Sequence, residues 1–164
     1  MDNDIYELAV VVGKALAAHN MMVATAESCT GGWVATALTA VPGSSAWLER
    51  GFVTYSNAAK CEMLGVGAAT IAHDGAVSEA VVREMASGAL NHSHAGASVA
   101  VSGIAGPDGG TPVKPVGTVC FGWALSGGPA HAATEHFAGD REVVRKQSVV
   151  RALRGLMALL ERGR

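Results

Sequence analysis

The sequence has no long apolar run, no block of one charge and few cysteines. No apolar stretch approaches the roughly 20 residues that a membrane-spanning helix needs, and the acidic start Met1-Asp2-Asn3-Asp4 is unlike a signal peptide. With 12 Lys and Arg against 14 Asp and Glu, the net charge is −2, so charge-driven binding to nucleic acid or to a membrane surface is not expected. The three cysteines, Cys29, Cys61 and Cys120, form no C-x-x-C pair. This pattern favours reduced thiols and a cytoplasmic protein.

Hydrophobic periodicity predicts helices that alternate with strands along the 164 residues. Helices are expected from a capping box at Asp4 and Glu7 to about residue 19, over 33–40, from caps at Asn57 and Ser78, and from a cap at Asp140. Strands are expected over 21–26, 50–56, 96–104, 116–125 and 130–137, with 65–75 as a connection. The pattern ends in a hairpin and favours one α/β domain over 1–164. Its architecture would be three α/β/α layers around a mixed sheet.

One predicted strand ends at a turn that is rich in hydroxyl, thiol and glycine residues. Ser28, Cys29, Thr30, Gly31 and Gly32 follow this strand and precede the helix that begins near residue 33. Backbone N–H groups at such a turn can hold a phosphate or the oxyanion of an acyl-transfer intermediate. Ser28 or Thr30 acting only as a helix cap is an equally good interpretation of these residues alone.

Polar side chains also follow the other predicted strands, where an α/β sheet forms its ligand crevice. Lys60 could serve as a general base if burial lowers its pKa, and Tyr55 could relay a proton or orient this lysine. Ser102 leads into a glycine-rich loop, Gly103 to Gly110, which is a candidate anion or ribose cradle but neither a Walker loop nor a dinucleotide fingerprint. Arg141 could hold an anionic group. Taken singly, each of Lys60, Tyr55 and Arg141 is better interpreted as an ordinary surface or half-buried residue.

A metal site is not expected. His92-x-His94 could chelate a metal from an extended segment, but no Cys, Asp or Glu accompanies the pair at a useful spacing. Surface histidines at a helix end are the better interpretation.

Six motifs in order resemble the CinA C-terminal domain family over nearly the whole chain. They are residues 26–32 (AESCTGG), 41–45 (VPGSS), 55–60 (YSNAAK), 75–78 (GAVS), 103–110 (GIAGPDGG) and 114–119 (KPVGTV). The resemblance implies an α/β/α domain that hydrolyses the carboxamide of nicotinamide mononucleotide (NMN), because characterised members are nicotinamide-nucleotide amidohydrolases. It also implies a homo-oligomer and no metal or organic cofactor. Many relatives carry a second, N-terminal domain, whose pyrophosphate-cleaving activity is not expected here.

The resemblance also implies roles for individual residues. Ser28 would be the nucleophile, Lys60 the general base and Tyr55 its assistant, while Ser45 would be an accessory hydroxyl. The remaining binding residues would be Thr30, Gly31, Gly32, Ser102, Gly103, Gly106 and Arg141. Ser102 stands where many relatives carry threonine, and Arg141 would hold the nucleotide phosphate, with Arg145 as the fallback.

Two alternatives stay open from the sequence. The thiol of Cys29 could be the nucleophile in place of Ser28. The chain could also be a nucleotide-binding or interaction module without turnover.

Overall fold

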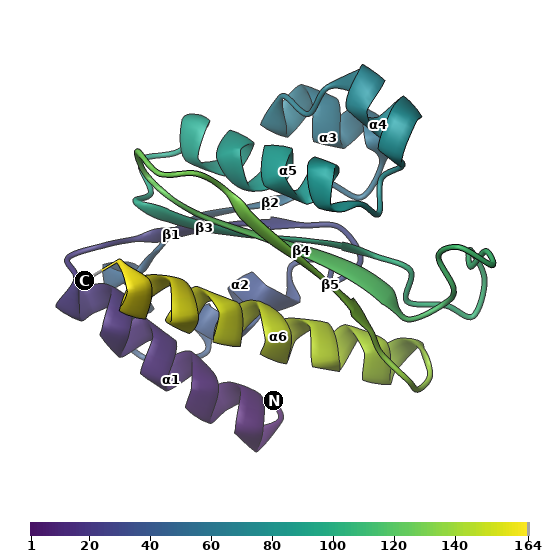
Figure 1. Ribbon diagram of the computed structural model, residues 1–164. Helices are drawn as coiled ribbons and strands as arrows, with labels where there is room; N and C mark the ends of the chain where they lie inside the picture. The colour runs from purple at the N-terminus through teal and green to yellow at the C-terminus, as the bar shows by residue number, and fades with distance from the viewer. Residues whose placement is uncertain (164) are drawn as a thin grey trace.

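Five strands form one mixed sheet in the computed structural model, which describes residues 1–163 (Figure 1). The strands are β1 (Val23–Glu27), β2 (Leu48–Val53), β3 (Ala97–Gly103), β4 (Thr118–Leu125) and β5 (His131–His136), in the order β2-β1-β3-β4-β5. β1 pairs in parallel with both β2 and β3, whereas β4 is antiparallel to β3 and to β5. The carboxyl ends of β1, β2 and β3 therefore share one edge of the sheet.

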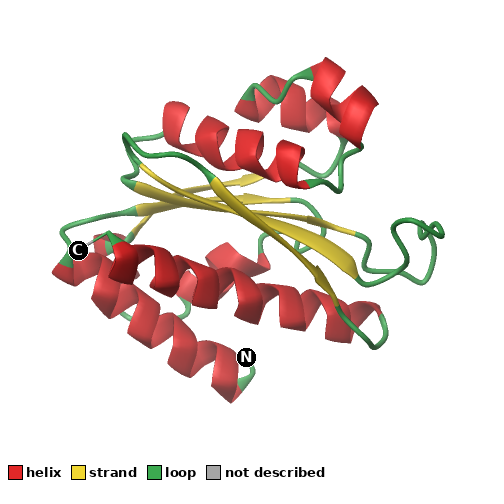
Figure 2. Cartoon of the chain, in the orientation of Figure 1, coloured by secondary structure: helices red, strands yellow, loops and turns green. Residues whose placement is uncertain are grey.

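Helices cover both faces of the sheet and complete three layers (Figure 2). One face packs on α1 (Asn3–Ala18), α2 (Trp33–Thr39) and α6 (Arg141–Arg162); the other packs on α3 (Asn57–Leu64), α4 (Ala68–Asp74) and α5 (Glu79–Asn91). A hydrophobic cluster lies on each side, with Leu16, Phe121 and Leu156 in the first and Met85, Val82 and Leu64 in the second. The predicted α/β/α architecture with a mixed sheet is confirmed.

Three helices begin where the sequence predicts, and two begin one or two residues earlier. Ser78 and Asp140 accept hydrogen bonds from the N–H groups of Val81 and Val143, as N-caps do. The first helix begins earlier than expected, because Asp2 rather than Asp4 is its N-cap. Likewise Ser56, not Asn57, caps α3 through a bond from Ala59 N–H. In both cases a better-placed side-chain oxygen lies just before the expected cap.

The connection expected over 65–75 contains a helix, α4. No side chain caps its start at Gly67; instead the N–H of Gly67 donates to Glu84 Oε1 in α5 at 3.0 Å. The helix is thus anchored from another element, which the local sequence does not reveal.

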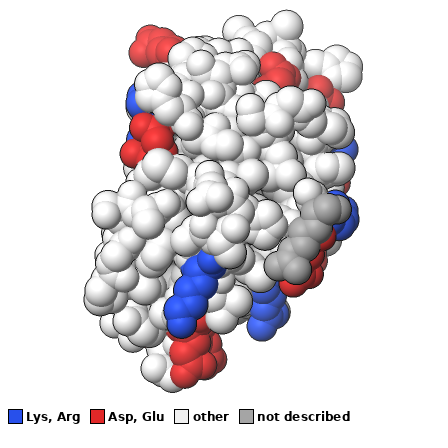
Figure 3. Space-filling model, turned by 90° about the vertical axis from the view of Figure 1, so that its left-hand side faces the viewer, with Lys and Arg blue, Asp and Glu red and all other residues white. Residues whose placement is uncertain are grey.

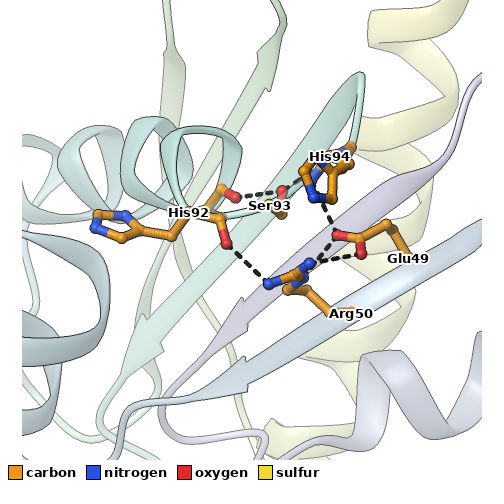
Figure 4. A network of polar contacts seen from close by, with 7 residues as sticks. Glu49, Arg50, His92, Ser93 and His94 are labelled. Carbon is orange, nitrogen blue, oxygen red and sulfur yellow. Dashed lines mark hydrogen bonds and ion pairs between the residues drawn. The ribbon is translucent and has the colours of Figure 1, made fainter.

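The sheet edge opposite the carboxyl ends is tied together by a polar network (Figure 4). Arg50 pairs with Glu49 and donates to the carbonyl of His92, while Glu49 also accepts from the His94 N–H. The rings of His92 and His94 point apart in Figure 4.

Charges of both signs are scattered on the face that Figure 3 shows, and neither sign forms a continuous patch there. Within the described part of the chain, none of the helices combines the length and the apolar character that crossing a membrane requires.

Candidate active site

A pocket of about 210 Å³ opens at the carboxyl ends of β1 and β3. Of the residues expected to form a site or weighed as its nucleophile, it is lined by Ser28, Cys29, Tyr55, Lys60, Ser102, Gly103 and Arg141. These residues come from β3, α3, α6 and the connections after β1 and β2. Figure 1 shows the first turn of α6 and the long β3–β4 loop at this same end of the sheet. The parallel pairing of β1 with β2 and β3 is what brings these distant segments together.

Ser28 and Lys60 form the polar centre of the pocket. Ser28 follows directly on β1, and Lys60 lies in α3, 32 residues later; Lys60 Nζ lies 3.1 Å from Ser28 Oγ. The same nitrogen lies 2.9 Å from the carbonyl oxygen of Thr54 and 3.5 Å from that of Tyr55. Lys60 shares the buried side of α3 with Leu64, four residues on. This spacing turns the lysine inward, toward the end of β1.

The Lys60 side chain is buried without an ion pair. Only 1% of the residue is exposed, and no carboxylate in residues 1–163 lies within ion-pair distance of its nitrogen. Burial lowers the pKa of Lys60 below its ordinary value of 10.5, because loss of hydration disfavours the charged ammonium. A lowered pKa enlarges the neutral fraction of the amine, which is the form that can accept a proton.

Glu27 organises the turn between β1 and α2, a role that sequence reasoning missed. Its carboxylate is buried and accepts hydrogen bonds from the N–H groups of Val34 at 2.8 Å and Ala35 at 3.1 Å. Gly32 at the N-cap has a φ of 100° and no side chain, so Glu27 supplies the missing acceptors. The sequence signal for this role was an acidic residue, Glu27, shortly before the glycines of the turn.

The backbone N–H groups of this turn are only partly free. Gly31 N–H donates to the carbonyl of Ser28 at 3.0 Å, and Trp33 N–H donates to that of Thr30. The N–H groups of Cys29, Thr30 and Gly32 donate to no backbone carbonyl within the described residues. The donors available for an oxyanion are therefore fewer than the whole 29–32 stretch, and they stand next to Ser28.

Cys29 packs into the apolar layer on the α6 side of the sheet and is 5% exposed. Burial raises the pKa of its thiol to about 12, although Arg145 acts in the opposite direction. A thiol with this pKa stays protonated near neutral pH, and the thiolate is the nucleophilic form. The geometry therefore favours Ser28 over Cys29 as the nucleophile.

Tyr55 and Arg141 meet across the mouth of the pocket. Arg141 Nη2 donates to Tyr55 Oη at 3.0 Å, and Nη1 donates to the carbonyl of Gly106 at 2.9 Å. Tyr55 is 60% exposed. Its hydroxyl thus contacts Arg141, while its carbonyl oxygen faces Lys60.

Arg145 contacts the turn from α6, and Thr30 is the buried residue of the turn that it reaches. Arg145 donates to the carbonyls of Cys29 at 3.0 Å and Thr30 at 3.2 Å, and its guanidinium lies over the Trp33 ring. The guanidinium of Arg145 is thus already bonded to the turn, whereas Arg141 lines the pocket. Arg141 is therefore the better placed of the two to contact a phosphate. Thr30 is fully buried, and its hydroxyl has no hydrogen-bond partner within residues 1–163.

Ser102 and the glycine-rich loop close another side of the pocket. Ser102 Oγ donates to the carbonyl of Ala76 at 2.8 Å. A Cβ at Gly103 would lie 2.7 Å from a methyl of Val119 and 3.1 Å from Cys29 Sγ. Glycine is needed here because the strand passes too close to its neighbours for a side chain.

Ser45 is not brought to the pocket. It is exposed in η1 (Ser44–Ala46), which precedes β2, whereas the pocket lies beyond the carboxyl end of that strand. Conversely, Asn57, Ala76, Val77 and Ala105 also line the pocket, although none of them was named as a site residue. Ala76 and Val77 belong to the GAVS motif, which was the available signal.

A larger hollow of about 420 Å³ lies between β5 and α6. Its Arg151 is already paired with Glu135 at 3.0 Å and stacked over Trp123 at 4.8 Å. It contains no serine, threonine or cysteine. No three His, Cys, Asp or Glu side chains are grouped to hold a metal ion anywhere in residues 1–163.

The sequence matches a known family model over most of its length. The family is described as the CinA C-terminal domain, and its model matches residues 5–160. The Escherichia coli (strain K12) protein named nicotinamide-nucleotide amidohydrolase PncC is 55% identical over 155 residues, covering 94% of both chains. The Pseudomonas putida protein of the same name is 53% identical over 155 residues, covering 94% of this chain and 96% of the relative.

Solved structures show the same fold. The competence/damage inducible protein CihA from Agrobacterium tumefaciens has a TM-score of 0.94 and 46% identity, with 97% of both chains covered. A CinA superfamily protein from Klebsiella pneumoniae has a TM-score of 0.92 and 42% identity, covering 96% of this chain and 98% of that one.

Proposed function

We propose that this chain, which belongs to the CinA C-terminal domain family, is a nicotinamide-nucleotide amidohydrolase that converts NMN to nicotinate mononucleotide and ammonia. The observation that carries the proposal is the buried contact of 3.1 Å between Lys60 Nζ and Ser28 Oγ, in a pocket on a chain similar to proteins named for this activity. In the proposed enzyme, Ser28 is the nucleophile and Lys60 is the general base.

The surroundings of Lys60 suit this role. A neutral amine has two N–H donors and one lone pair. The carbonyls of Thr54 and Tyr55 can take the two donors, at 2.9 and 3.5 Å, which leaves the lone pair to accept the Ser28 hydroxyl proton. With no carboxylate at ion-pair distance in the described chain, little opposes the loss of the ammonium charge.

The reaction proceeds by acyl transfer. Lys60 takes the proton of Ser28 as the oxygen attacks the carboxamide carbon, and the N–H groups of Cys29 and Thr30 stabilise the oxyanion. The protonated Lys60 then delivers its proton to the departing nitrogen, and ammonia leaves an ester on Ser28. Water attacks this ester with Lys60 again as the base, which releases the carboxylate and restores the serine.

Arg141 holds the phosphate of the nucleotide in this proposal. Its Nη2 is directed to an exposed tyrosine hydroxyl, a neutral partner that a phosphate can replace with a stronger, charge-assisted contact. Its other terminal nitrogen stays on the carbonyl of Gly106, which keeps the guanidinium at the pocket mouth. Tyr55 orients Arg141 through its side chain until the phosphate takes its place, and it contacts Lys60 through its main-chain carbonyl throughout.

Ammonia release from NMN by the purified chain tests the proposal. The Ser28→Ala variant is expected to fold and to release no ammonia above the uncatalysed rate. Ser126→Ala is the matched control, because this exposed turn serine lies between β4 and β5, away from the pocket. Release that persists in Ser28→Ala but is lost in Cys29→Ala would establish the thiol alternative. Binding of NMN by a folded wild-type chain without ammonia release would favour the binding module.

The oligomeric state, the domain organisation and the location belong to the same proposal. In it, residues 1–164 form one domain, and the enzyme is a homo-oligomer in the cytoplasm. Light scattering on the purified chain at several concentrations tests the oligomeric state.

A further inference from the structure

The segment of residues 74–78 separates the pocket from a second hollow. Ala76 and Val77 line the catalytic pocket, and Val77 also lines a hollow of about 580 Å³ on its other side. Asp74, Ser78 and Lys114 line this second hollow as well. Because open space lies on both sides of the segment, close packing alone does not fix its position.

Hydrogen bonds from side chains hold the segment instead. Three successive carbonyl groups, those of residues 74–76, each accept one such bond. The donors are Lys114 Nζ to Asp74 O at 2.6 Å, Ser78 Oγ to Gly75 O at 2.8 Å and Ser102 Oγ to Ala76 O at 2.8 Å. The first of them spans 40 residues and ties the segment to the loop between β3 and β4.

Lys114 is itself firmly placed. Its N–H donates to Thr111 Oγ1 at 3.0 Å, and its carbonyl accepts from Thr111 N–H at 2.8 Å, which closes a turn around it. The ammonium lies so close to Gly75 that a Cβ there would meet Nζ at 3.2 Å. No carboxylate in the part of the chain that the structure describes pairs with Lys114. Within the described residues, the Lys114 side chain therefore makes one hydrogen bond, to the carbonyl of Asp74 in this segment.

We propose that Lys114 is a positioning residue for the amidohydrolase reaction, which makes this inference dependent on the function proposed above. Lys114 sets the place of the Ala76–Val77 wall, and this wall sets the place of the carboxamide relative to Ser28 Oγ. Lys114 does not line the catalytic pocket and does not contact the reacting atoms. The role matters because a displacement of about 1 Å from the attack geometry can cost on the order of 100-fold in rate.

The test compares two substrates in the full chain. NMN needs the wall for its orientation, whereas p-nitrophenyl acetate is a small activated ester that can acylate Ser28 without it. Lys114→Met removes the donor and keeps most of the side-chain volume. Lys114→Arg keeps a donor that can reach Asp74 O. Lys114→Leu, which also lacks a donor, serves in place of the methionine variant if that variant does not fold by circular dichroism.

Lys114→Met is expected to lower kcat for NMN by roughly 10- to 100-fold and to leave ester hydrolysis within about twofold of wild type, a change too small for lost orientation. Lys114→Arg is expected to recover most of the NMN activity. Parallel loss of both activities would assign Lys114 a merely structural role and overturn the proposal, as would unchanged NMN turnover in Lys114→Met. A wild-type chain that hydrolyses the ester but releases no ammonia from NMN would overturn the proposed function, and this inference with it.

Discussion

Replacing Lys60 by methionine should separate activity from stability. Methionine fills much of the same buried space but has no basic nitrogen. Loss of the general base should lower kcat/KM for NMN by on the order of 10²- to 10⁴-fold. Loss of the bond to Thr54 O leaves a buried carbonyl unsatisfied, which costs about 1–3 kcal/mol in the free energy of unfolding. Relief from burying an amine of lowered pKa acts in the opposite direction, by about 1.4 kcal/mol per pKa unit at a pH where the amine is protonated.

The two opposing effects can be resolved by pH. Between the lowered pKa of Lys60 in the folded chain and the ordinary value of 10.5, the unfolded chain binds a proton that the folded chain does not. The wild type should therefore gain stability as pH rises through this window, by up to about 1.4 kcal/mol per pH unit relative to Lys60→Met. Below the folded pKa both states bind the proton, and the difference between the variants should be constant.

Urea unfolding of wild type and Lys60→Met at a series of pH values measures this difference. In the folded enzyme, kcat/KM should rise with pH up to the lowered pKa of Lys60 and level off above it, where the stability difference begins to grow. Parallel stability curves would refute the reasoning, since they would mean that the pKa of Lys60 is not changed by folding. A wild type that loses stability relative to the variant as pH rises would also refute it. Lys60→Arg is a useful second variant, because its guanidinium stays charged and cannot act as the base.

Three further predictions concern neighbours of the Ser28–Lys60 pair. Cys29→Ala should keep NMN turnover while losing roughly 1–2 kcal/mol of stability from its packed site; loss of turnover in the folded variant would contradict the serine mechanism. Arg141→Ala should raise KM for NMN by about 10- to 100-fold, as expected for lost charge-assisted bonds, and change KM for nicotinamide riboside little, since that substrate lacks the phosphate. Equal effects on both substrates would exclude a phosphate contact. Glu27→Ala should lower stability by about 3 kcal/mol or more, because the N–H groups of Val34 and Ala35 lose charged acceptors. Glu27→Gln should cost less, and equal melting temperatures for Glu27→Ala and wild type would contradict this role.

The layered fold was predictable because its elements carry strong periodic signals. The apolar stretches at β1 and β3 and the amphipathic patterns of α1, α5 and α6 correspond to elements within a few residues of the expected bounds. The α4 helix was missed because its first N–H is held by Glu84 in another helix. Caps at Asp2 and Ser56 were misplaced by one or two residues, since several polar side chains compete for each helix start.

The pocket was predictable only in outline. Parallel strands put their carboxyl ends at one edge, so Ser28, Lys60 and Ser102 could be expected near one another. Their contact distances, however, depend on the angle at which α3 packs. The placement of Ser45 before β2 and the contact of the Tyr55 hydroxyl with Arg141 depend on loop conformations that local patterns do not encode. The bond from Lys114 to Asp74 spans 40 residues and joins a loop to the C-terminal end of α4, so no periodicity predicts it.

The central claim is that the substrate becomes covalently attached to Ser28. Acid quenching of the wild-type chain within milliseconds of mixing with NMN, followed by peptide mass spectrometry, tests it most directly. The account predicts an ester of the nicotinate nucleotide on the peptide that contains Ser28. It also predicts that Ser28→Ala carries none. An adduct on Cys29, or full turnover with no adduct on Ser28 under conditions where acylation outpaces hydrolysis, would contradict it.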